Sequence, residues 1–162
     1  MTLDVSISEP CGSQQLTLSD LTEATFPGGT AGEKAAWRNR LRVLGIRGAI
    51  TPVAGGGKSG FHRRYDGLSV IIAKAVCTLL DTYQVHTDIA VKIGHHIRAH
   101  RHELDCGDPV LVLGDWSEAD GSQSSSFIIG CRDYILEQIS ERRFRHVLIL
   151  QLEEPEGEGG LT

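Results

Sequence analysis

The spacing of apolar residues changes at Cys106-Gly107-Asp108-Pro109, and this change constrains the fold more than any other feature of the chain. Before this point the apolar residues recur at helical intervals, most clearly over residues 68–83. After it, residues 110–116 and 126–131 are rich in β-forming residues and flank a polar loop. Helical and β-rich segments that follow one another without alternating predict an α+β fold.

Two helices are predicted near the N-terminus. The polar run Thr17-Leu18-Ser19-Asp20 supplies capping residues for a short helix that ends before Pro27. A second helix is predicted over residues 33–43, with Gly45 as its stop. Its inward-facing residues are expected to be Ala36, Leu41 and Leu44.

A basic hairpin and two more helices are expected next. Residues 49–53 and 61–65 are predicted as short extended segments, joined by the glycine-rich loop 54–60. Residues 68–83 then form the most regular helical stripe. A further helix should begin at Thr87 or Asp88 and end near His102.

The last third of the chain predicts a small ββαβ element. Residues 110–116 and 126–131 are expected to pair as a hairpin, followed by a helix over 133–143 and a strand over 146–152. The predicted organisation is therefore a flexible leader (1–14), a first domain (15–104), a dimerisation or partner element (109–152) and a disordered acidic tail (153–162).

Positive charge is concentrated in the middle of an acidic chain. Residues 28–101 contain 12 of the 16 Lys and Arg but 4 of the 21 Asp and Glu, a formal charge of +8 in a protein whose net charge is −5. Because counterion release rewards a local density of cations, this segment indicates a nucleic-acid surface. A solvated basic helix face is the alternative interpretation.

The hairpin gives the chain a resemblance to a known family. Gly60-Phe61-His62-Arg63-Arg64-Tyr65-Asp66 resembles the aromatic-Arg-x-Tyr wing signature of MerR-type transcriptional regulators, and the order of elements over residues 16–101 is similar. The resemblance implies a winged helix-turn-helix, with the second helix in the major groove and the wing on phosphates. It implies DNA contacts by Trp37, Arg38, Arg40 and Arg42 on the helix and by Lys58, Arg63, Arg64 and Tyr65 on the wing.

Helical spacing divides the arginines of the second helix. Arg38 and Arg42 are four residues apart and should share a face, which favours them for base or phosphate contact, whereas Arg40 points elsewhere. Trp37 could instead anchor the core, since a large apolar ring on a helix is usually buried. Tyr65 could either pack the wing or donate its hydroxyl to a phosphate.

Other site chemistries have weaker support. His96, His100, His102 and Cys106 form a candidate metal cluster, but a solvated helix end is the favoured interpretation of the histidines, because the HxxxH spacing alone is a weak signal. Gly55-Gly56-Gly57-Lys58-Ser59 lacks the first glycine of a phosphate-binding loop, and no nucleophile motif is present. The four cysteines contain no CxxC pair, and we expect reduced thiols.

The sequence therefore predicts a protein that binds double-stranded DNA as a transcriptional regulator, with no enzymatic activity and no cofactor. A homodimer reading two half-sites is expected, with RNA polymerase as a further partner. The alternatives are a phage or mobile-element packaging or recombination accessory protein, and a metal- or ligand-responsive sensor. No apolar run is long enough to cross a membrane, and a cytoplasmic, nucleoid-associated location is expected.

Overall fold

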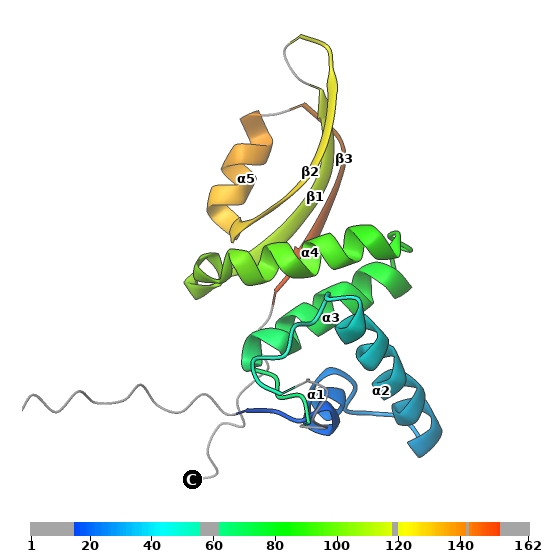
Figure 1. Cartoon of the computed structure of the whole chain (residues 1–162). Helices are drawn as coiled ribbons and strands as arrows, with labels where there is room; N and C mark the ends of the chain where they lie inside the picture. Colours follow the sequence, from blue (N-terminus) through cyan, green and yellow to red (C-terminus); the bar gives the residue numbers. More distant parts are fainter. Residues whose placement is uncertain (1–14, 56–61, 118–119, 142, 153–162) are drawn as a thin grey trace, which may run out of the picture.

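The computed structural model describes residues 15–55, 62–117, 120–141 and 143–152, which form an α+β fold (Figure 1). Along the chain, four helices and a short 3-10 helix come before a three-stranded antiparallel sheet. A fifth helix follows the second strand in the sequence and precedes the third. The elements are α1 (Leu18–Thr25), α2 (Ala31–Ile46), α3 (Gly67–Asp81), α4 (Thr87–Ala99), η1 (Arg101–Asp105), β1 (Pro109–Ser117), β2 (Gln123–Cys131), α5 (Arg132–Glu141) and β3 (Arg143–Gln151).

Capping boxes fix the starts of α1 and α2. The Thr17 hydroxyl accepts from the Asp20 amide while the Asp20 carboxylate accepts from the Thr17 amide, which confirms the predicted start of α1. Thr30 and Glu33 make the same reciprocal pair on α2. The second helix was therefore predicted to begin too late, because its cap precedes the first apolar position. Leu41 and Leu44 are buried as expected, whereas Ala36 is exposed.

The predicted helix stop at Gly45 is wrong, since α2 continues to Ile46. A Cβ atom at Gly45 would lie 3.4 Å from Arg63 Nη1 and 3.6 Å from the Tyr65 hydroxyl. These are ordinary van der Waals distances, so Gly45 lies beside the 62–65 segment without being required by that contact. The residue that leaves the helical conformation is Gly48, with a φ of +83°.

The predicted pair of strands after α2 is reduced to isolated bridges. Ala54 pairs with Arg64, and Tyr65 pairs with Leu16 near the start of α1. Residues 49–53 do not form a strand because Ala49 donates its amide to Leu44 at the end of α2, and Ala49 and Ile50 are buried. The tip of the expected wing, residues 56–61, lies outside the described residues.

The predicted helices α3 and α4 are confirmed, with different ends. Asp66 caps α3, and the ring of His86, rather than Thr87 or Asp88, occupies the N-cap of α4. The expected helix to His102 is interrupted after Ala99 and continues as η1. Arg98 of α4 bonds to both carboxylate oxygens of Asp66, at 3.1 and 3.2 Å, and so ties the start of α3 to the end of α4.

The C-terminal part of the chain is the predicted ββαβ element. The strand order is β2-β1-β3, both pairings are antiparallel, and one register shift occurs in β1 between Asp115 and Trp116. Helix α5 covers one face of the sheet, and α4 crosses the base of the sheet (Figure 1). The predicted bounds of α5 and β3 differ from those observed by one to three residues.

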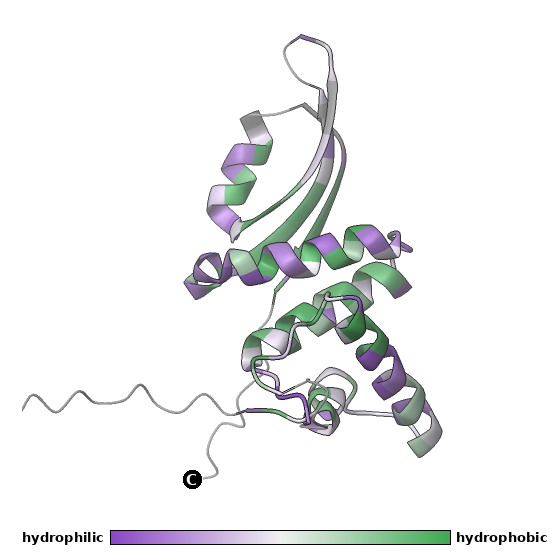
Figure 2. Ribbon diagram, in the orientation of Figure 1, coloured by the Kyte–Doolittle hydropathy of each residue, from purple (hydrophilic) through white to green (hydrophobic). Residues whose placement is uncertain are grey.

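The helices and the sheet share one apolar core. Leu111 and Ile129 from the sheet, together with Leu152 just after β3, belong to the same buried cluster as Ile93 and Ile97 of α4. A second, smaller cluster between the sheet and α5 is formed by Val110, Val112, Ile135, Ile128 and Ile139. Apolar residues accordingly run through both halves of the molecule in Figure 2.

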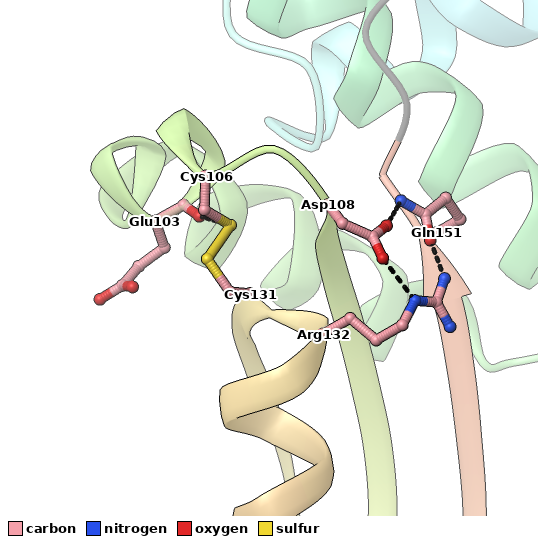
Figure 3. The surroundings of a disulfide bond; sticks show 6 residues. All are labelled: Glu103, Cys106, Asp108, Cys131, Arg132 and Gln151. Atoms are coloured by element: carbon pink, nitrogen blue, oxygen red, sulfur yellow. Dashed lines mark hydrogen bonds and ion pairs between the residues drawn. A yellow bond between two sulfur atoms is a disulfide. The ribbon is translucent and has the colours of Figure 1, made fainter.

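A disulfide joins η1 to the end of β2, so the expectation of reduced thiols is wrong for Cys106 and Cys131 (Figure 3). Their Cα atoms are 5.7 Å apart, a normal separation for a disulfide. The spacing of the cysteines did not predict this pair, because Cys106 and Cys131 are distant in the sequence and come together only in the fold. Cys77 is a free thiol in the core, and burial raises its pKa to about 12. Cys11 lies outside the described residues.

The same corner contains a polar network. Arg132 Nε lies 2.6 Å from the Asp108 carboxylate, and the Gln151 side chain hydrogen-bonds to both Asp108 and Arg132 (Figure 3). The starts of β1 and α5 and the end of β3 are thereby held together. Within the described ranges, none of the helices combines the length and apolar character that crossing a bilayer requires.

Candidate nucleic-acid interface

A basic groove of about 720 Å³ lies between the start of α1, one face of α2 and the 62–65 segment. None of the described residues that line this groove is acidic. We refer to it as the arginine groove. Its lining residues are Thr17, Leu18, Ser19, Arg38, Arg42, Ile46, His62, Arg63, Arg64 and Tyr65.

Arg38 and Arg42 occupy the α2 side of the arginine groove. Both are exposed and lie one turn apart, which confirms that they share a helix face. Arg38 Nη2 donates to the Ser19 hydroxyl at 3.2 Å, and Arg42 Nη2 donates to the Asn39 side-chain oxygen at 2.8 Å. Neither arginine has an acidic partner among the described residues. No described carboxylate therefore neutralises the positive charge of either guanidinium group, and several of their N–H donors are available to an anion.

Arg63 and Arg64 face them from the other side of the groove. The backbone of Arg64 is fixed by hydrogen bonds with Val53 and Ala54, including a 2.7 Å bond from its amide to the Ala54 carbonyl. Both side chains are half-buried, and Arg63 lies against Gly45. The backbone from which the Arg64 side chain projects is therefore ordered before an anion binds, which lowers the backbone entropy that binding must remove at this residue.

The nearest acidic residue is already engaged by the backbone. Hydrogen bonds from the Thr17 amide and hydroxyl lower the pKa of the exposed Asp20 carboxyl, and the charge of Arg64 lowers it further. Asp20 therefore serves as the capping partner of Thr17 and is ionised at neutral pH. The described lining of the arginine groove therefore carries an excess of positive charge, because it contains four arginines and no carboxylate.

Arg40 and Trp37, two of the predicted DNA contacts, lie outside the groove. Arg40 pairs with Asp81 of α3 at 2.6 Å and lies 5.6 Å from the centre of the Trp37 ring. The indole stacks on Phe26 at 5.2 Å and donates its N–H to the Thr25 hydroxyl at 2.8 Å. These contacts fix α2 against α1 and α3, so the packing alternative for Trp37 is the one observed.

Tyr65 is a core residue, contrary to its predicted role as a phosphate ligand. Its side chain is only 1% exposed, and its backbone pairs with Leu16. A buried hydroxyl cannot reach a phosphate outside. The sequence also missed the contributions of His62, Thr17 and Ser19 to the groove. His62 adjoins the predicted arginines, whereas nothing local places Thr17 and Ser19 beside α2. Lys58 lies outside the described residues.

The histidine cluster is a packing contact between α4 and the sheet. The rings of His96 and His100 are 4.0 Å apart, and His96 meets Phe127 of β2 edge-on at 4.7 Å. Burial, followed by the charge of His100, lowers the pKa of His96 and favours its neutral form. Cys106 is bonded to Cys131 and is not a free ligand. The described residues contain no group of three side chains arranged to hold a metal ion.

Known proteins do not assign a function to this chain. No family model matches the chain, and no curated protein sequence matches it.

Proposed function

We propose that this protein binds double-stranded DNA in a sequence-specific manner and acts as a transcriptional regulator through a winged helix-turn-helix to which α1, α2 and the segments 49–55 and 62–65 belong. The observation that carries the proposal is the arginine groove, in which a helix and an extended segment place four arginines around one opening. The resemblance of residues 60–66 to the MerR-type wing supports the same assignment.

The chemistry of the two sides supports different roles. Arg38 and Arg42 project from an exposed helix face, where a guanidinium group can donate two bonds to the O6 and N7 atoms of guanine. Arg63 and Arg64 come from a segment fixed to Ala54 and Leu16, which suits phosphate contacts that set the register. Arg40 and Trp37 position α2 and do not contact DNA in this proposal.

The test begins with a pool of random-sequence duplexes, from which the purified protein selects its preferred site. Fluorescence anisotropy with the selected duplex then compares wild type with the double variant Arg38→Ala and Arg42→Ala. We expect at least a thirtyfold loss of affinity, since removing base-contacting arginines costs about 2 kcal/mol or more. Affinity for random duplex should fall less, and the salt dependence should become shallower by about 0.9 for each phosphate that the variant no longer neutralises.

The matched control is Arg47→Ala with Lys92→Ala, which removes the same charge from two exposed residues outside the arginine groove. This variant should retain selectivity. Equal losses of affinity in both double variants would show that bulk charge alone drives binding. If the protein enriched no sequence from the pool, the regulator proposal would be wrong. A DNA accessory protein with little discrimination between sequences would then be favoured.

A further inference from the structure

We propose that the protein forms a homodimer by antiparallel pairing of the β3 edge, giving one continuous sheet through two copies. Within the described residues, β3 pairs with β1 alone, so its other side is an open edge. Backbone amides and carbonyls on such an edge can pair with an identical strand. This surface is separate from the arginine groove and does not depend on the proposed DNA function.

Apolar side chains remain uncovered along β3. Val147 and Ile149 are 39% and 37% exposed, although Val112, which pairs with Ile149 on the same face, is buried under α5. The described apolar core beneath α5 draws its strand residues from β1 and β2, so α5 leaves this strip of β3 open. Leu136 of α5 is also exposed, at 43%, and lies one turn beyond Arg132, whose side chain reaches Gln151 of β3.

The opposite edge of the sheet differs from β3. The exposed positions of β2 include Ser125 and Ser126, and its other end is joined to η1 through the Cys106–Cys131 disulfide. Polar side chains and a covering segment protect a strand from edge-to-edge association. The part of β3 from His146 to Gln151 contains neither proline nor lysine, so it lacks two common protective features.

The order of charges in the sequence favours a second copy in the antiparallel direction. Arg142, Arg143 and Arg145 precede the apolar run of β3, and Glu153 and Glu154 follow it. Two copies running in opposite directions bring unlike formal charges together, whereas parallel copies bring like charges together. Pairing centred on Leu148 also sets Val147 of each copy across from Ile149 of the other, on the face beside α5.

The experiment measures mass by sedimentation and light scattering without DNA, over a roughly hundredfold range of protein concentration. Wild type should reach twice the chain mass of 17.6 kDa. The double variant Val147→Lys and Ile149→Lys places like charges across the interface and should raise the dimer dissociation constant at least about tenfold. The control, Ser125→Lys with Ser126→Lys on the β2 edge, should dimerise like wild type.

A second variant, Val147→Glu with Ile149→Glu, separates an interface effect from a folding defect. Mixed with the lysine variant, it should restore the dimer, because each lysine then faces a glutamate. A monomeric wild type, equal effects of the lysine variants on the two edges, or failure of the mixture to dimerise would each overturn the proposal. DNA binding by a monomer would leave the arginine groove assignment intact, so the two proposals fail separately.

Discussion

The arginines of α2 have similar sequence neighbours but different partners in space. Arg40 is paired with Asp81 and lies near the face of Trp37, whereas Arg38 and Arg42 contact only neutral side chains. A paired arginine loses its partner when it binds DNA, so Arg40 gains less from such a contact. Charge counts along a sequence treat the three residues alike, whereas helical spacing puts Arg40 on another face and the fold supplies its partner, Asp81.

Trp37 illustrates a positioning role at the scale of a residue. We expect Trp37→Ala to lower the free energy of unfolding by about 2 kcal/mol, since it removes the Phe26 stack and the bond to Thr25 from a half-buried site. Trp37→Phe keeps the stack and should lose about half as much. Urea unfolding followed by circular dichroism measures both. If Trp37→Ala left the stability unchanged but weakened DNA binding, the predicted contact of Trp37 with DNA would be supported instead.

At the scale of elements, one carboxylate, that of Asp66, links the start of α3 to the end of α4. Burial alone raises the pKa of Asp66, but hydrogen bonds from Arg98 and Ser69 outweigh burial and lower the pKa below its usual value. A lowered pKa in the folded state stabilises the fold at neutral pH, and this stabilisation is lost as the pH falls through the folded-state pKa. Asp66→Asn retains a capping side chain on α3 but loses the ion pair.

We therefore expect wild-type stability to fall on acidification below about pH 4, the ordinary range for an aspartate, partly through Asp66. The asparagine variant should be less stable at neutral pH and should lose less on acidification. Urea titrations at several pH values measure this difference. Parallel curves for the two proteins would show that Arg98 and Asp66 are not coupled.

The elements that the sequence predicted are those with local signals. The apolar stripe of α3, the Thr17 cap and the β-forming residues of β1 and β2 are each encoded within a few neighbouring residues. The α2 end, the short bridges after it and the disulfide depend on segments far apart in the sequence. The same division applies to the groove, where Arg38 and Arg42 were predictable from spacing but Ser19 was not.

At the scale of the whole molecule, the Cys106–Cys131 bond closes a loop across 25 positions of sequence and fastens the sheet to η1. Closing a loop of this length restricts the unfolded chain and contributes about 3 kcal/mol in the chain-entropy model. Reduction of the wild type should lower the unfolding free energy by about this amount. The double variant Cys106→Ser and Cys131→Ser should have the reduced stability and no response to dithiothreitol. A wild type equally stable with and without reductant would contradict this expectation.

The core that α4 shares with the sheet has a mechanical consequence. Ile93 and Ile97 pack in one cluster with Leu111 and Ile129, so the sheet cannot swing relative to the helices without repacking that cluster. The contact between α4 and the sheet is therefore not a hinge. Two copies joined along β3 would hold their α2 helices at a set distance and angle, and the separation of paired binding sites on a duplex would be dictated by the protein rather than adjusted to the DNA.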